Sequence, residues 1–160
     1  MKVIVPFTYV IREQVRALMI DHVEPLYVYM EEESSYWRLL KRLWEERETF
    51  VLVEHDIIPW PGAIAALWAC DSPWCTYEYP LENYSILAGF GCTLVRDVLM
   101  EAVPNVWDEA PETHWWGLDS WLSHKSLSLL GRDKPHLHAP PVTHLNPWRF
   151  PLDSPVHNAS

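Results

Sequence analysis

The chain has 160 residues, of which 49% are hydrophobic and 21% charged, a balance typical of one globular domain that buries its own core. A net charge of -10 argues against binding to a nucleic-acid backbone, because that affinity rests on clustered lysine and arginine. The apolar start at residues 3–7 is too short for a signal peptide, and no segment reaches the length of a membrane span. We therefore expect a cytoplasmic protein.

The cysteine content is also typical of a cytoplasmic protein. Cys70, Cys75 and Cys92 are odd in number and form no Cys-x-x-Cys pair, which makes a disulfide framework or a zinc knuckle unfavourable. We expect three reduced, buried thiols.

Predicted strands and helices alternate through the first half of the chain. The β-branched and aromatic runs predict strands at 3–5, 25–30 and 50–53. Apolar residues at helical spacing predict a helix at 11–19 and a short helix around 64–68, with Pro61 near its start. The clearest amphipathic helix follows the candidate caps Ser34 and Ser35, and its apolar face is formed by Tyr36, Leu39, Leu40, Leu43 and Trp44.

The second half is less regular. Residues 71–84 are rich in proline, tyrosine and tryptophan and predict no clear element, and 84–90 predicts a strand. We expect a helix that Thr93 caps and that carries Leu94 to Leu99, irregular chain at 104–116, and a helix from Leu118 closed by Gly131. Residues 135–141 and 142–145 predict short extended pieces, followed by a Pro-rich tail at 147–160. The alternation indicates a single α/β domain with a largely parallel sheet.

The first candidate site is Glu54-His55-Asp56, directly after the predicted strand at 50–53. Open α/β sheets place ligands at this end of their strands, and carboxylates and imidazole are ordinary ligands of Mg, Mn or Zn. A late histidine, from His136, His138 and His144, is a candidate partner. The alternative is a solvated acidic turn and histidines on a surface loop.

Three further segments carry groups suited to chemistry. Asp119, in the first turn of a predicted helix, is a candidate general base, or simply a helix cap. Gly89 and Gly91 either let backbone approach a ligand or form a plain strand-to-helix turn. The turn from Pro6 to Tyr9 offers aromatic rings and the Thr8 hydroxyl to a base or sugar, or lies at the edge of the core.

Taken in order, these segments resemble a glycosyltransferase of the GT-A type, in particular its family-2-like members. The run from Val3 to Tyr9 is similar to the first strand and nucleotide-contacting turn of that family, with Phe7 inserted between Pro6 and Thr8. Glu54-His55-Asp56 stands where the family has Asp-x-Asp, so the Glu at the first position favours Asp56 as ligand.

The resemblance continues in the second half and covers residues 1–146. Gly89-Phe90-Gly91 running into a helix with Arg96 resembles the acceptor-side strand and its turn. Leu118-Asp119 stands where the family carries its catalytic base, and His144 resembles the late histidine of the metal site, with His138 as second choice. The chain also resembles very small glycosyltransferase-like proteins of bacteriophages, and it is short for this fold.

The resemblance implies a three-layer α/β/α GT-A (Rossmann-like) domain at 1–146 with a mainly parallel central sheet, and a tail at 147–160. It implies transfer of a sugar from a UDP- or GDP-linked donor to an unknown hydroxyl acceptor. Mn2+ or Mg2+ would be held by Asp56, His144 and Glu54, and Asp119 would deprotonate the acceptor, with inversion at the sugar. Donor contacts are implied for Pro6, Thr8, Tyr9, Glu54, His55, Gly89 and Gly91.

Other side chains are weaker candidates in this scheme. Candidates for stacking on a sugar ring are Trp60, Trp115 and Trp116, and the alternative for each is packing in the core. Phosphate contacts are a role for Arg12, Lys125, Arg132 and Lys134, with solvated surface as the default. Two other functions stay open: a non-catalytic nucleotide- or carbohydrate-binding domain, and a metal-dependent phosphoester hydrolase.

Overall fold

The structure is a computed structural model, and it describes residues 2–8, 24–32, 34–80, 86–87, 89–110, 117–138 and 142–145. The helix expected at 11–19 and the tail at 147–160 lie outside these ranges, as do Tyr9, Arg12, Trp115 and Trp116.

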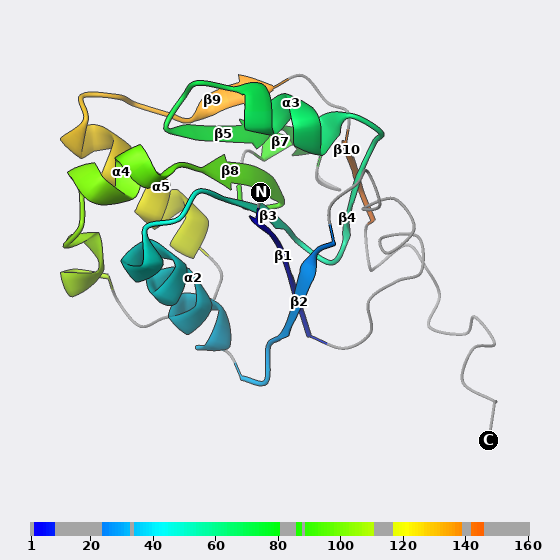
Figure 1. Cartoon of the computed structure of the whole chain (residues 1–160), viewed down its shortest axis with the longest axis horizontal. Helices are drawn as coiled ribbons and strands as arrows, with labels where there is room; N and C mark the ends of the chain where they lie inside the picture. The colour runs from blue at the N-terminus through cyan, green and yellow to red at the C-terminus, as the bar shows by residue number, and fades with distance from the viewer. Residues whose placement is uncertain are drawn as a thin grey trace.

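A six-stranded mixed sheet forms the centre of the molecule, in the order β2-β1-β3-β8-β5-β9 (Figure 1). Its strands β2, β1, β3, β5 and β9 run in one direction, and β8 runs antiparallel to both of its neighbours, β3 and β5. The prediction of an α/β domain with a mainly parallel sheet is therefore confirmed. The bounds, in sheet order, are Leu26–Tyr29, Lys2–Phe7, Phe50–Val53, Cys92–Val95, Trp74–Tyr77 and His136–His138.

Helices cover both faces of this sheet. The helices α2 (Ser35–Glu46), α4 (Asp97–Ala102) and α5 (Leu118–Leu129) share one apolar cluster, together with the 3-10 turn η1 (Val106–Asp108). Helix α3 (Ala63–Ala69) packs on the opposite face in a second cluster. In β3, alternate side chains enter the two clusters, and all four are buried. Burial on both sides explains why this strand is an unbroken apolar run.

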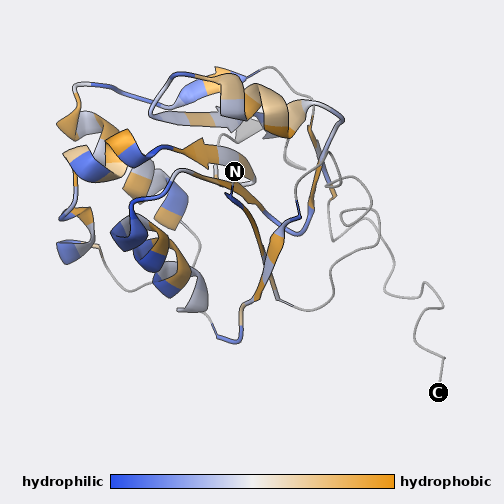
Figure 2. Ribbon diagram, viewed as in Figure 1, coloured by the Kyte–Doolittle hydropathy of each residue, from blue (hydrophilic) through white to orange (hydrophobic). Residues whose placement is uncertain are grey.

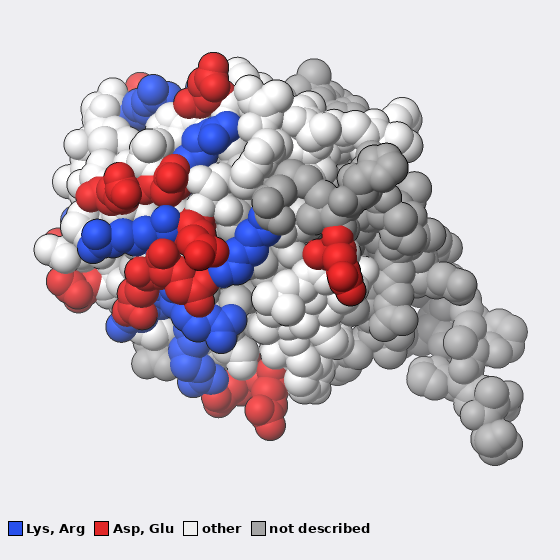
Figure 3. Space-filling view, in the orientation of Figure 1, with Lys and Arg blue, Asp and Glu red and all other residues white. Residues whose placement is uncertain are grey.

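Helix α2 shows how the pattern of the sequence becomes packing. Its five apolar residues at helical spacing are all buried, whereas Arg38, Arg42, Glu45 and Glu46 are exposed. Hydrophobic and hydrophilic positions accordingly alternate along the ribbon of this helix (Figure 2). The indole of Trp44 donates a hydrogen bond of 3.1 Å to the carbonyl of Val103, which satisfies both buried groups. On the face shown in Figure 3, acidic and basic side chains are intermixed, and Lys2 and Arg42 both pair with Glu46.

Two small sheets complete the fold. The strand β4 (Ile57–Pro59) pairs antiparallel with β10 (Val142–His144), and β6 (Tyr79–Pro80) pairs antiparallel with β7 (Ile86–Leu87). Among the described residues, no helix combines the length and hydropathy needed to cross a bilayer.

Three predictions differ from the structure, and three strands were not predicted. The helix expected from Leu94 is wrong: Cys92–Val95 is the buried strand β8, and α4 begins at Asp97. The strand expected at 84–90 is described only as the short β7, while β4, β5 and β6 were not predicted. The thiols of Cys70 and Cys75 form a disulfide, because the short connection from α3 to β5 brings their Cα atoms to 6.9 Å. Cys92 is free and buried, as expected.

Candidate functional site

A cleft of about 340 Å³ lies where β1, β2 and β3 end. The last two residues of β1, Pro6 and Phe7, and the following Thr8 line it, and β2 contributes Tyr29 to its wall. Tyr36, at the start of α2, and the tripeptide Glu54-His55-Asp56 close the side next to β3. The cleft therefore collects the two segments in which the sequence predicted nucleotide and metal contacts, because parallel neighbours end at the same edge of a sheet.

Asp56 and His144 meet beside this cleft. The pairing of β10 with β4 sets His144 opposite Ile57, and the backbone N–H of Leu145 donates to the carbonyl of Asp56 at 2.6 Å. The Nε2 atom of His144 thereby lies 3.3 Å from Oδ2 of Asp56. Burial by itself opposes ionisation of Asp56, but the hydrogen bond with His144 and the positive charge of His55 outweigh it, and the pKa of Asp56 lies below its ordinary value.

Glu54 lies in a different electrostatic environment. Its carboxylate accepts a hydrogen bond of 3.0 Å from the hydroxyl of Tyr36, and its backbone N–H donates to the carbonyl of Gly91 at 2.8 Å. Burial, with the negative charges of Asp56 and Asp119, raises the pKa of Glu54 to about 8. The two carboxyl groups of the tripeptide are thus held in opposite protonation states near neutral pH, a separation that suits different roles.

Asp119 reaches the same cluster from the N-terminal turn of α5. It lies in the first turn of α5, after Gly117 in a left-handed conformation, and its Oδ1 accepts the backbone N–H of Ser120 at 2.6 Å. Its Oδ2 faces Gly89: a Cβ added to this glycine would lie only 2.4 Å from Oδ2 of Asp119. Because the charge of Asp119 contributes to the raised pKa of Glu54, the third carboxylate belongs to one electrostatic group with the other two.

Tyr79 lies beside these groups, although no sequence pattern predicted it as a site residue. Its ring stacks on the imidazole of His144, with centroids 5.2 Å apart, and it packs on Gly91, where a Cβ would lie 2.5 Å from Cε1. Burial, together with the charges of Glu54 and Asp119, raises the pKa of Tyr79 far above its ordinary value. It lies in the Tyr-rich segment that predicted no element, so composition offered the only signal.

Gly89 and Gly91 therefore serve the packing of neighbouring side chains in this structure. Their missing side chains leave room for the carboxylate of Asp119 and the ring of Tyr79. Between them, Phe90 is buried and stacks on Trp74, with centroids 5.5 Å apart. The segment continues into a strand, so the expected turn into a helix with Arg96 is not formed.

Several candidate residues lie elsewhere. Trp60 is 57% exposed and donates to the hydroxyl of Thr143, and it does not line the cleft. Lys125 pairs with Glu109, Arg132 donates to Ser72, and Lys134 is exposed. Arg96 donates to the carbonyls of Trp68 and Cys70 at the end of α3. His138 packs on Tyr77 and His136, so His144, and not His138, is the histidine beside Asp56.

No protein-family model and no curated protein matches the sequence. Solved structures align over most of the chain. A glycosyltransferase involved in glycosylation of the major capsid of PBCV-1 is 15% identical, with a TM-score of 0.44 over 87% of this chain and 82% of that one. A hypothetical transferase from Thermus thermophilus is 10% identical, with a TM-score of 0.45 over 88% and 93%.

A third similar structure is described as a glucose-1-phosphate thymidylyltransferase from Bacillus anthracis in complex with sucrose. It is 8% identical, with a TM-score of 0.48 over 86% of this chain and 67% of that one. With identities this low and TM-scores below 0.5, these likenesses carry no argument about activity.

Proposed function

We propose that this protein is a metal-dependent glycosyltransferase, which moves a sugar from a UDP- or GDP-linked donor to a hydroxyl acceptor. The observation that carries the proposal is the contact of 3.3 Å between Asp56 and His144 beside the cleft. A carboxylate oxygen and an imidazole nitrogen converge there from segments far apart in the sequence. An ordinary acidic turn needs no such partner.

Two side chains of the types that hold a divalent cation meet at this position. Asp56 has a lowered pKa and is ionised near neutral pH, and Nε2 of His144 lies next to its Oδ2. Oxygen and imidazole nitrogen suit Mn2+, and carboxylate oxygen suits Mg2+. When bound, the cation neutralises the charge that develops on the diphosphate leaving group. Glu54 is the weaker ligand, because its raised pKa keeps a proton on it and Tyr36 occupies one of its oxygens.

The opposite wall of the cleft suits the nucleotide. The rings of Phe7 and Tyr29 lie 5.5 Å apart in a tilted arrangement, and Tyr29 is 57% exposed, so a face is open for stacking. Thr8 also lines this cleft. A base on this wall would direct its phosphates toward Asp56. Pro6 and His55 also line this cleft, whereas Gly89 and Gly91 act through the packing of Asp119 and Tyr79.

Asp119 is the proposed general base. Its Oδ1 is held by the N–H of Ser120, which fixes the carboxylate, and its negative charge contributes to the raised pKa of Glu54. In the proposed reaction Asp119 accepts the proton of the attacking hydroxyl, and attack opposite the leaving group inverts the anomeric carbon. Tyr79 stacks on the imidazole of His144 and limits its movement.

The direct test supplies UDP- and GDP-linked sugars with Mn2+ and no acceptor, so that water takes the acceptor's place. Release of free sugar together with the nucleoside diphosphate is the expected result. Release of nucleoside monophosphate or inorganic phosphate would instead indicate a phosphoester hydrolase. Metal-dependent binding without any turnover would indicate a binding domain.

A substitution sharpens this test. Asp119→Asn preserves the shape of the side chain and removes the base, so we expect turnover to fall by about 100-fold or more while donor binding is kept. Asp133→Asn, at an exposed carboxylate, is the control and should change neither. Normal turnover in Asp119→Asn would remove this residue as the base.

A further inference from the structure

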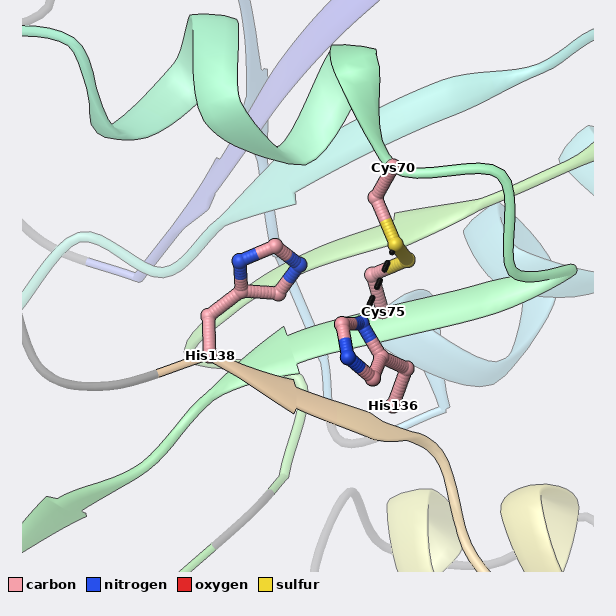
Figure 4. A group of neighbouring side chains, drawn as sticks. All are labelled: Cys70, Cys75, His136 and His138. Carbon is pink, nitrogen blue, oxygen red and sulfur yellow. Dashed lines mark hydrogen bonds between the residues drawn. A yellow bond between two sulfur atoms is a disulfide. The ribbon is translucent and has the colours of Figure 1, made fainter.

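A second cluster of ligand-type side chains lies on the opposite part of the sheet, away from the cleft. In the parallel ladder of β5 and β9, Cys75 is the register partner of His136. His138 follows two residues later and therefore faces the same side of the sheet. Cys70 caps the end of α3, which covers this face, and completes the group (Figure 4).

The four side chains converge on one point. One ligand atom from each of Cys70, Cys75, His136 and His138 lies within 4.8 Å of all the others. Nδ1 of His136 is 3.2 Å from the sulfur of Cys70, and the two imidazole rings have centroids 4.8 Å apart. Four soft or borderline donors in so small a volume match the donor set of a tetrahedral zinc site.

His138 supplies an independent indication of a missing ligand. Its Nε2 atom is buried and has no hydrogen-bond partner within the described part of the chain. Buried polar atoms are almost always paired, because an unpaired one loses the hydrogen bonds that it makes in water. In Figure 4 a ring nitrogen of His138 is turned toward the sulfur atoms. The disulfide between Cys70 and Cys75 accounts for the two sulfurs but leaves this imidazole unexplained.

We propose that the reduced form of this protein binds one Zn2+ through Cys70, Cys75, His136 and His138. Reduction by a dithiol transfers two electrons to the Cys70–Cys75 disulfide and gives two thiols and an oxidised, cyclic reductant. Zinc then binds the two thiolates and the two neutral imidazoles, and both thiol protons go to solvent. The disulfide and the zinc complex are alternative states of the same pair of cysteines.

Four protein ligands leave no open position, so the role of this zinc is structural. It ties the edge strand β9 to β5 and to the end of α3. The next described strand along the chain is β10, which carries His144 of the candidate active site. The site is independent of the proposed transferase function, and its test needs no activity.

The experiment compares the oxidised protein with protein reduced by dithiothreitol and desalted anaerobically. Each form is titrated with Co2+ and then with Zn2+. We expect the reduced form to bind one Co2+ with the visible absorption of a tetrahedral centre and a sulfur-to-cobalt charge-transfer band, both abolished by Zn2+. We expect neither signal from the oxidised form. Absence of the charge-transfer band in the reduced protein would overturn the proposal.

Substitutions separate this site from the carboxylate cluster. His138→Gln should weaken zinc binding by more than about tenfold, yet the disulfide should still form on oxidation. His124→Gln, at an exposed histidine of α5, and Asp56→Asn, at the other candidate metal site, should leave the charge-transfer band unchanged. A band that persists undiminished in His138→Gln would contradict the assignment. The comparison of redox forms in the unmodified chain does not depend on whether any variant folds.

Discussion

Nε2 of His144 lies 3.3 Å from Oδ2 of Asp56, and a backbone ladder enforces the contact. β10 pairs with β4, and the N–H of Leu145 reaches the carbonyl of Asp56. The ring of Tyr79, stacked on His144, limits the freedom of the imidazole. The pair is thus pre-organised by structure that surrounds it, as a metal site requires.

Removing either member of this pair should abolish the response to metal. With Mn2+ and a nucleoside diphosphate at about 100 times its Kd, a binding protein gains about 2.7 kcal/mol of stability. We expect Asp56→Asn and His144→Gln to gain nothing, because each removes one ligand. Thermal unfolding with and without Mn2+ measures this, with Thr143→Ser on the same strand as the control. A variant at Asp56 that retains the full shift would refute the metal assignment.

The protonation of Glu54 predicts how stability depends on pH. Its pKa is about 8 in the folded chain and 4.5 ordinarily, so the folded state holds the extra proton between these values. The free energy of unfolding should therefore fall as the pH rises through this window, by on the order of 2 kcal/mol after allowance for solvent screening.

Glu54→Gln should flatten this dependence, since glutamine is neutral at every pH and its oxygen can still accept from Tyr36. Urea unfolding in EDTA, at several pH values across the window, measures the difference between variant and parent. Parallel curves for the two proteins would show that Glu54 titrates normally.

The two glycines before β8 should respond differently to alanine. In Gly91→Ala the new Cβ meets the ring of Tyr79 at 2.5 Å, and the ring is confined by His144, so we expect a loss of about 1–3 kcal/mol of stability. In Gly89→Ala the new Cβ meets Oδ2 of Asp119 at 2.4 Å, at the end of a side chain and not at a confined ring, so turnover should fall with a smaller loss of stability. Denaturant unfolding and transferase assays of both variants distinguish the cases, and equal effects would argue against these contacts.

Arg96 should matter for stability and not for donor binding. Its guanidinium donates to the carbonyls of Trp68 and Cys70, which end α3. Arg96→Lys cannot reach both acceptors, so we expect a loss of about 1–3 kcal/mol, whereas the affinity for a nucleoside diphosphate stays unchanged. Calorimetry measures both quantities, and Arg132→Lys, at an exposed arginine, is the control. A loss of affinity in Arg96→Lys would place this residue in the binding site after all.

Local sequence patterns were enough to predict a short, unbroken apolar strand and a clearly amphipathic helix. The apolar run at Phe50–Val53 was predicted with its observed bounds, and α2 follows the spacing of its five buried residues. The same reasoning failed at β8, because Leu94, Val95 and Leu99 fit a helical spacing as well. Both β3 and β8 are buried on both faces and show no alternation, but the apolar spacing of β8 continues into α4, so its pairing with β3 and β5 is what identifies it as a strand.

The sequence by itself determined the layered α/β fold and the acidic end of β3, since hydrophobic periodicity and strand ends are local properties. The tertiary structure alone decided which histidine meets Asp56, which cysteines meet, and that Tyr79 and Asp119 both lie against Gly89. These contacts follow from strand order and register, which place residues distant in the chain side by side, and no local pattern encodes that choice.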